Sequence, residues 1–164
     1  RRGAARRARS SDTWFAAGEA DFGIVVDGDG ESLKVFDDQA QPVDAAALVV
    51  LFAERLASGG KKPLVLTESP LPAPALASLE RIGVATRSLG TVERPATRQE
   101  VHTALVESNA ELAGGPSGRF PFGGSLAPVD ALVTFAHLLA LAGADKRPLA
   151  ARLKATLART QVAG

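Results

Sequence analysis

The residues best suited to chemistry stand in one short acidic run, Asp-Gly-Asp-Gly-Glu, which places Asp27, Asp29 and Glu31 at alternate positions. Three carboxylates this close together repel one another, and a hard divalent cation such as Mg²⁺, which prefers oxygen ligands, offsets that repulsion. The two intervening glycines leave the backbone free to turn the carboxylates toward one point. The run therefore predicts a metal or phosphate site. The alternative is an acidic hairpin turn, because Asp-Gly is also a strong turn signal.

A second candidate site is the glycine-rich stretch Gly-Gly-Pro-Ser-Gly-Arg at residues 114–119. A short apolar segment precedes it, just as the apolar run at residues 22–26 precedes the acidic run. In parallel sheets, ligands gather at the carboxyl ends of the strands, so two loops that follow strands can share one rim. We therefore expect the two loops to converge.

Hydrophobic periodicity indicates the elements that must position these loops. Apolar runs predict strands at residues 22–26, 33–36, 64–67 and 84–88. Helical patterns cover residues 4–17, 45–56, 75–82, 98–108, 129–142 and 148–159, with Asp44 and Thr97 as N-caps. Strands that alternate with helices predict an α/β fold with a largely parallel sheet.

The composition is that of an ordinary globular protein, with 164 residues of which 46% are apolar and 23% are charged. The absence of cysteine excludes disulfides and Cys-ligated zinc, and two histidines are too few for a histidine-rich metal site. No apolar run approaches the roughly 20 residues that span a bilayer, and the arginine-rich start lacks the apolar core of a secretion signal. We therefore expect a cytoplasmic protein with no membrane partner.

The net charge of +1 hides a basic leader in front of a mildly acidic body. Five of the 19 basic residues are arginines within the first nine positions, which leaves 14 basic against 18 acidic residues in the rest of the chain. The leader has no interleaved aromatic residues, and the body offers no basic helix. We therefore interpret the leader as a solvated helix face and expect no nucleic-acid partner.

Taken together, these stretches resemble the alpha-D-phosphohexomutase family, the phosphomannomutases and phosphoglucomutases. That family has a metal loop, Asp-Gly-Asp-Gly-Asp-Arg, after an apolar strand, and residues 20–32 match this pattern. It also has a sugar-reading loop, Gly-Gly-Glu-x-Ser-Gly-His, matched by residues 114–119, and beyond it an apolar helix matched from residues 130–133 onward. Order and spacing agree over nearly the whole chain.

The resemblance implies a three-layer α/β/α fold with a mixed, largely parallel sheet. The sites that it implies are a Mg²⁺ site at Asp27, Asp29 and Glu31 and a hexose-phosphate site at Gly115, Ser117, Gly118 and Arg119. It also implies a longer, four-domain enzyme, in which residues 1–41 would close the second domain and residues 42–164 would form the third. The phosphoserine that such mutases need belongs to a domain that nothing here matches. No catalytic residue is therefore assigned, and we expect the chain to be inactive without missing domains or a partner chain.

Several positions depart from the family pattern. Glu31 replaces the third aspartate of the metal loop, and Ser32 replaces an arginine that would face the phosphoryl group, which removes a charge-assisted donor. The sugar loop is one residue shorter, with Pro116 where its glutamate would stand, and Arg119 stands at the family's histidine. These losses predict a degenerate member of the family, such as a pseudoenzyme or a scaffold.

Two other interpretations stay open. The first is a non-catalytic domain that binds a sugar phosphate or serves in protein assembly. The second is a haloacid dehalogenase-type phosphatase, with Asp27 as nucleophile, Asp29 as acid/base and Thr67 in its second motif, although this leaves residues 114–119 unexplained. An incomplete sheet at residues 1–41 would expose a strand edge, so we also expect a homo-oligomer.

Overall fold

The computed structural model describes residues 17–124 and 129–158. Its strands are β1 Phe22–Val26, β2 Leu33–Asp37, β3 Leu64–Thr67, β4 Ala85–Ser88 and β5 Leu112–Gly114, and its helices are α1 Ala45–Ala57, α2 Ala73–Arg81, α3 Arg98–Ser108, α4 Ala131–Ala144 and α5 Leu149–Ala158. The helix predicted over residues 4–17 lies almost wholly outside the described residues. None of the helices in the described ranges combines the length and apolar character that a membrane span needs.

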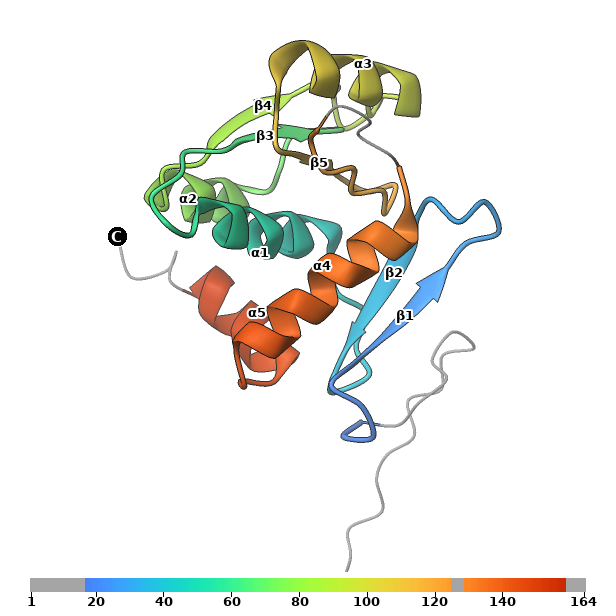
Figure 1. The fold of residues 1–164 in the computed structure, drawn as a ribbon, viewed down its shortest axis with the longest axis vertical. Coiled ribbons are helices and arrows are strands. Elements are labelled where there is room, and N and C mark those ends of the chain that lie inside the picture. Colours follow the sequence, from blue (N-terminus) through green and yellow to red (C-terminus); the bar gives the residue numbers. More distant parts are fainter. Residues whose placement is uncertain (1–16, 125–128, 159–164) are drawn as a thin grey trace, which may run out of the picture.

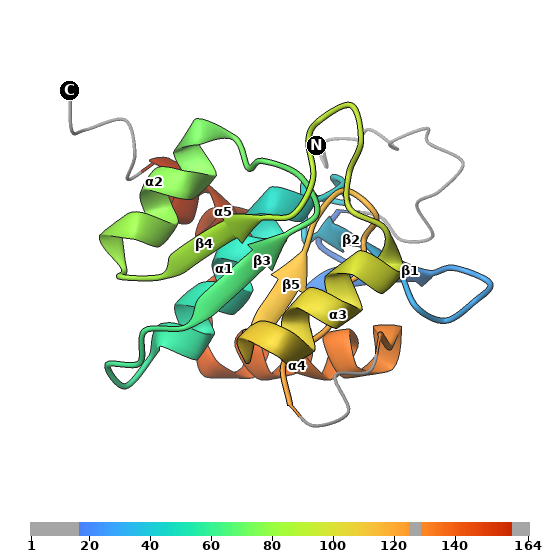
Figure 2. The same ribbon diagram turned by 90° about the horizontal axis from the view of Figure 1, so that it is seen from above.

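The centre of the molecule is a three-stranded parallel sheet in the order β4-β3-β5. Val65 of β3 stands opposite Leu112 of β5, and Leu64 stands opposite Ala85 of β4. Helices cover both faces of this sheet, with α1 and α2 on one side and α3 on the other (Figures 1 and 2). The predicted three-layer α/β/α fold with a largely parallel sheet is therefore confirmed.

Side chains that alternate along β3 fill a core on each face of the sheet. Val65 packs in the larger core, with residues of α1 and α2, whereas Leu66 packs in a smaller core with Val101 and Leu105 of α3. Both strand residues are fully buried. A strand that is buried on both faces is apolar at successive positions, which explains the uninterrupted apolar run that predicted β3.

β1 and β2 form a separate antiparallel hairpin, and the acidic run is the turn that joins them. Phe22 stands opposite Asp37 at the open end, and Val26 stands opposite Leu33 next to the turn. The Phe22 ring contacts Phe135 of α4 edge to face, with ring centroids 6.2 Å apart. This contact places the hairpin beside α4 (Figure 1).

The predicted helix caps are present. The Asp44 carboxylate accepts a hydrogen bond from the first turn of α1 at 2.7 Å. Thr97 and Glu100 form a capping box at the start of α3, in which each side chain accepts a backbone N–H from the other residue. α2 begins two residues earlier than predicted because Pro74 fits a first helical turn, and α4 begins two residues later because Asp130 is its N-cap.

Candidate functional site

The first acidic side chain, Asp27, is bound by Ser32 at the other end of the turn. The Ser32 backbone N–H donates to Asp27 Oδ1 at 3.1 Å, and the Ser32 hydroxyl donates to Oδ2. These hydrogen bonds, led by that of the hydroxyl, lower the pKa of Asp27 to about 2. Asp27 is therefore ionised at neutral pH, and the hydrogen bonds from Ser32 stabilise its negative charge.

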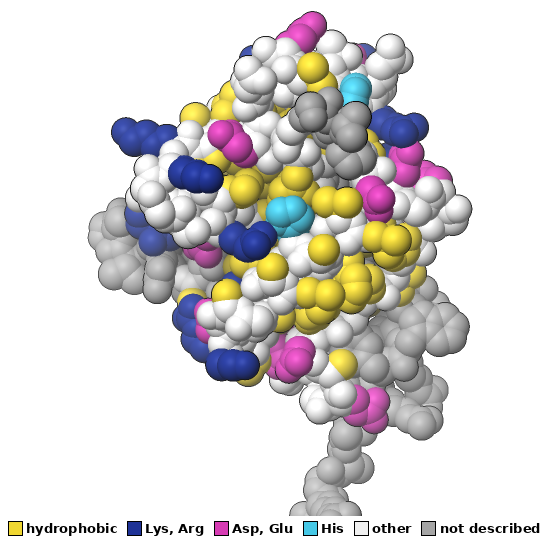
Figure 3. Space-filling model, in the orientation of Figure 1, with side chains coloured by type: hydrophobic (Ala, Val, Ile, Leu, Met, Phe, Trp, Pro, Cys, Tyr) yellow, Lys and Arg dark blue, Asp and Glu magenta, His cyan; other side chains and the backbone are white. Residues whose placement is uncertain are grey.

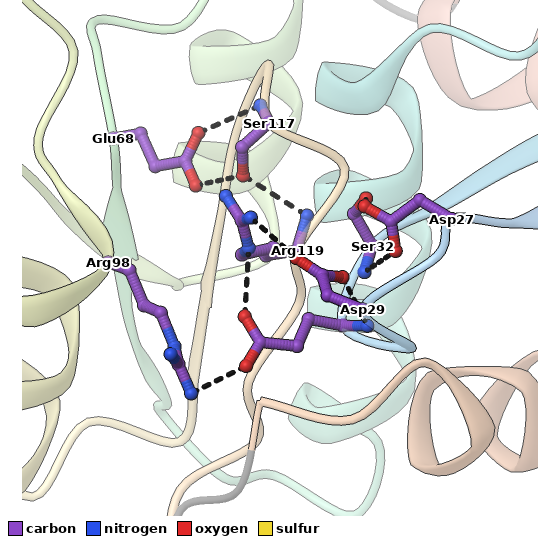
Figure 4. A network of polar contacts seen from close by, with 8 residues as sticks. Asp27, Asp29, Ser32, Glu68, Arg98, Ser117 and Arg119 are labelled. Carbon is purple, nitrogen blue, oxygen red and sulfur yellow. Dashed lines mark hydrogen bonds and ion pairs between the residues drawn. The ribbon is translucent and has the colours of Figure 1, made fainter.

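The other two acidic side chains face a guanidinium group that comes from the second loop. Arg119 Nη2 lies 3.3 Å from Asp29 Oδ2, and Arg119 Nε lies 3.4 Å from Glu31 Oε2. Asp29 Oδ1 accepts a hydrogen bond from the Glu31 backbone N–H at 2.9 Å. In Figure 4, Arg119 extends from its place beside Ser117 toward the acidic turn. The two loops are therefore joined by ion pairs.

A second cation reaches the turn from the start of α3. Arg98 Nη2 lies 2.5 Å from Glu31 Oε1, so each oxygen of this carboxylate pairs with a different guanidinium group. The Glu31 side chain is 16% exposed, whereas that of Arg98 is 60% exposed. Glu31 is thus enclosed between two cations, one of which is largely in solvent.

The second loop is anchored by a buried carboxylate, Glu68, which directly follows β3. Glu68 Oε2 accepts a hydrogen bond from the Ser117 backbone N–H at 2.9 Å, and Oε1 accepts one from the Ser117 hydroxyl. The Ser117 hydroxyl oxygen in turn accepts the backbone N–H of Arg119 at 3.2 Å. Gly115 packs on the same carboxylate, because a Cβ at this position would lie 2.7 Å from Glu68 Oε2. Glu68 therefore determines the path of the loop.

The two loops converge, as the sequence predicts. The Leu33 backbone N–H donates to the Gly118 carbonyl oxygen at 3.0 Å, which joins β2 to the second loop. Gly118 has a φ of +76°, and a Cβ there would lie 2.8 Å from the Leu33 carbonyl oxygen, so this crossing requires glycine. On its other side, the acidic turn is bound to the start of α4, where the Ala131 N–H donates to the Gly30 carbonyl oxygen at 2.9 Å.

A cavity of about 470 Å³ lies where the loops come together. Its polar lining comes from both loops and from β2, and consists of Asp27, Ser32, Lys34, Ser117 and Gly118. Apolar residues of β1, β2, α1 and the second loop, together with Phe120, complete the lining. This volume is typical of small-molecule sites. Of the four residues predicted to contact substrate, Ser117 and Gly118 line the cavity, whereas Gly115 and Arg119 lie beside it in the loop.

The three acidic residues of the turn do not fit a divalent cation in this arrangement. Asp27 is bound by Ser32, while Asp29 and Glu31 are paired with Arg119, so the carboxylates already have donors from the protein. Within the described residues, no three or more acidic or histidine side chains come together in a group that could hold a metal ion. A magnesium titration tests the site that the sequence predicts at this turn.

Two residues of the site, Glu68 and Arg98, were missed by the sequence reasoning. Glu68 directly follows β3, and the carboxyl end of a parallel strand is where functional side chains gather, so its position was an available signal. Arg98 gives no such signal, because an exposed arginine after the cap residue Thr97 is ordinary on a helix surface.

The fold is similar to that of several solved sugar-phosphate mutases, although no protein-family model and no curated protein matches the sequence. A protein from Thermus thermophilus assigned to the phosphomannomutases has a TM-score of 0.74 at 18% identity, over 88% of this chain and 32% of that one. A phosphoglucomutase/phosphomannomutase family protein from Burkholderia thailandensis has a TM-score of 0.70 at 24% identity, over 84% of this chain and 29% of that one.

A third similar structure is the N-acetylphosphoglucosamine mutase of Aspergillus fumigatus in complex with GlcNAc-6P and magnesium. Its TM-score is 0.63 at 13% identity, over 92% of this chain and 35% of that one. The present chain therefore spans about a third of the length of each of the three. At these identities the likeness establishes the fold, and it confirms at that level the resemblance that the motifs indicate.

Proposed function

We propose that this chain, which has the fold of phosphohexomutase domains, is part of a phosphohexomutase-like protein and binds a hexose phosphate between its two loops. The observation that carries this proposal is the shared cavity, because the hairpin turn and the second loop line it together although they lie far apart in the sequence. The motif order described above supports the same ligand class. The Aspergillus mutase, which shares the fold, is itself complexed with a hexosamine phosphate.

The polar lining of the cavity offers the groups that a sugar phosphate needs. Lys34 supplies an ammonium group to the phosphate, and the ionised oxygens of Asp27 accept hydrogen bonds from sugar hydroxyls. Ser117 and the backbone of Gly118 complete the polar side, and the apolar side, which includes Phe120, faces the carbon atoms of the ring.

Gly115 and Arg119 have a supporting part in this proposal. Gly115 allows the loop to lie against Glu68, where a side chain would collide with the carboxylate. Arg119 binds the second loop to the acidic turn through its ion pairs with Asp29 and Glu31. Both residues thus shape the site rather than line it.

We propose that the chain binds its ligand without transferring the phosphoryl group by itself. The sequence matches no phosphoserine loop, and the acidic turn is engaged by arginines, which supports the non-catalytic alternative. In a longer protein with the missing domains, the same site would contribute to intramolecular phosphoryl transfer. The phosphatase alternative has less support, because the fold of this chain is similar to that of the three mutases reported above.

We also propose that the chain consists of two structural parts, residues 1–41 and residues 42–164. The β1–β2 hairpin forms a sheet of its own, and the parallel sheet begins only at β3, which supports two structural parts. In this arrangement residues 1–41 carry the acidic turn and residues 42–164 carry the second loop.

Titration calorimetry with glucose 1-phosphate and mannose 1-phosphate tests the proposal. We expect saturable binding of at least one of them, and we expect Lys34→Gln to weaken it by about tenfold or more, because a charged hydrogen bond is lost. Lys61→Gln, a change at an exposed lysine before β3, is the matched control and should leave the affinity unchanged. Absence of saturable heat at millimolar sugar phosphate, or an equal effect of the two variants, would contradict the proposal.

A further inference from the structure

Two carboxylates of the acidic turn are matched by two guanidinium groups of the same chain. Asp29 and Glu31 pair with Arg119, at 3.3 and 3.4 Å, and Glu31 also pairs with Arg98, at 2.5 Å. The two positive charges equal the two negative ones. The turn thus meets cations from two distant parts of the fold, the loop after β5 and the start of α3.

Arg119 is held in this position by more than its charge. Its backbone N–H donates to the Ser117 hydroxyl oxygen, so the start of the side chain is fixed to the anchored loop. Its side chain is 29% exposed, and its Nε atom is buried. In the described part of the chain this Nε atom makes no hydrogen bond, and its ion pair with Glu31 is therefore what offsets its burial.

Asp27, the third acidic residue of the turn, interacts with the Asp29 side chain but has its own hydrogen-bond donors. Its oxygens accept the hydroxyl and the backbone N–H of Ser32, and neither arginine pairs with it. The turn is therefore not a set of three equivalent carboxylates awaiting one ion. It is one hydrogen-bonded carboxylate beside a compact group of two acids and two arginines.

We infer that Arg119, assisted by Arg98, is the built-in cation of the acidic turn, so that the turn keeps its shape without a divalent metal ion. A metal ion would have to displace the Arg119 guanidinium from both Asp29 and Glu31. That displacement would leave the buried Nε of Arg119 without its counter-charge. This inference concerns the acidic turn alone, and it holds whether or not the neighbouring cavity binds a sugar phosphate.

Metal titration of the full chain tests the inference without any need for activity. The chain is stripped with a chelator and titrated with MgCl₂ in a calorimeter, and its Tm is recorded with and without millimolar MgCl₂. For the unaltered chain we expect no saturable heat and no magnesium-dependent change in Tm. For Arg119→Gln we expect a Tm lower by about 2–4 °C, because its ion pairs are lost. We also expect magnesium to restore part of this loss, because Asp29 and Glu31 are then free to bind it.

Arg94→Gln is the matched control. Arg94 forms an exposed ion pair with Glu100 at 2.8 Å and takes no part in the ion pairs of the acidic turn given above, so this variant should remain insensitive to magnesium. If Arg119→Gln does not fold, Arg98→Gln replaces it. This change frees one oxygen of Glu31 but leaves Arg119 in place, so we expect a smaller gain in magnesium response. Saturable magnesium binding by the unaltered chain that Asp29→Asn abolishes would overturn the inference. A folded arginine variant that responds to magnesium no more than Arg94→Gln would also overturn it.

Discussion

The carboxylate of Glu68 accepts two hydrogen bonds from Ser117, a residue 49 positions further along the chain. Glu68 stands at the end of β3 and Ser117 stands in the loop after β5, so this contact fixes the loop to the carboxyl edge of the parallel sheet. Because Glu68 is only 5% exposed, its charge depends on these donors rather than on water. The shape of the proposed sugar-phosphate site therefore depends on a residue outside both loops.

Replacement of Glu68 should destabilise the fold and weaken ligand binding together. Glu68→Ala leaves two partly buried donors of Ser117 without an acceptor, and we expect a loss of about 1–3 kcal/mol in the free energy of unfolding. Urea denaturation measures this loss, and Glu80→Ala, at an exposed position of α2, is the control. An equal loss in the two variants would show that Glu68 does not anchor the loop.

The crossing of the second loop over β2 should be intolerant of a side chain at Gly118. Gly118 and Gly59 have similar positive φ angles, +76° and +86°, but a Cβ at Gly118 meets the Leu33 carbonyl oxygen at 2.8 Å, whereas a Cβ at Gly59 meets nothing within 4 Å. Gly59→Ala should therefore cost about 1 kcal/mol in stability, from backbone strain alone. Gly118→Ala should cost about 2–4 kcal/mol, because a steric collision is added. Equal Tm values for the two variants would contradict this account.

A stacked histidine makes the stability of the chain depend on pH. The rings of His137 and Phe122 are stacked, with centroids 3.5 Å apart and planes 5° apart, and Arg55 Nη1 lies 2.7 Å from His137 Nδ1. A guanidinium group can only donate, so Nδ1 accepts and the neutral ring carries its proton on Nε2. Burial, and then the charge of Arg55, lower the pKa of His137 below its ordinary value of 6.5.

The free energy of unfolding should therefore rise with pH over the interval that ends near the ordinary pKa of His137, 6.5. In this interval the unfolded chain binds a proton at His137 that the folded chain does not bind, so acid favours unfolding and the stabilisation is complete above pH 6.5. Denaturation at a series of pH values measures the slope. His137→Gln should flatten it, and His102→Gln, at an exposed position of α3, should not. A slope that survives in His137→Gln would count against this origin.

We also expect the chain to associate with itself. In the described residues β1 pairs with β2 alone, so one edge of the hairpin is unpaired, and α4 beside it exposes Leu132 (67%) and Leu139 (50%). Figure 3 shows apolar side chains gathered over this side of the molecule. A free strand edge next to an apolar helix face favours contact with a second copy.

Light scattering at increasing concentration tests this association. The double change Leu132→Glu with Leu139→Glu should shift the chain toward the monomer, because charges replace the apolar contact. Val106→Glu, at a residue of α3 that is equally exposed (51%), should leave the mass unchanged. A strictly monomeric chain at high concentration would contradict the expectation of a homo-oligomer.

The elements of the fold were predictable because their signals are local. The bounds predicted for β3 from its apolar run, and for α3 from the Thr97 cap, agree with those in the structure. The two loops converge as predicted, but not at one rim of a parallel sheet, because β1 belongs to a separate antiparallel hairpin. The loops meet where the second loop crosses β2. The register of the β1–β2 hairpin was not predicted, because it depends on packing against α4.

The pairings within the site could not be predicted from the sequence. Asp27, Asp29 and Glu31 form one pattern in the sequence, but Ser32 binds the first, and an arginine 90 residues beyond Asp29 binds the other two. Such contacts depend on how the second loop crosses β2, which no local pattern encodes. The sequence marked Arg119 as a substrate contact, whereas its contacts in the structure are the ion pairs with the acidic turn.

The most direct test of the central claim is to map the binding of glucose 1-phosphate by two-dimensional amide NMR. If the cavity between the loops binds a hexose phosphate, the amide signals of Ser32, Lys34, Ser117 and Gly118 shift together and saturate with one affinity. Lys34→Gln reduces that affinity, and Lys61→Gln does not. Absence of saturable shifts at millimolar ligand would contradict the claim. So would shifts gathered at the other end of β5, around the separate cavity of about 490 Å³ lined by Asn109 and Gly123.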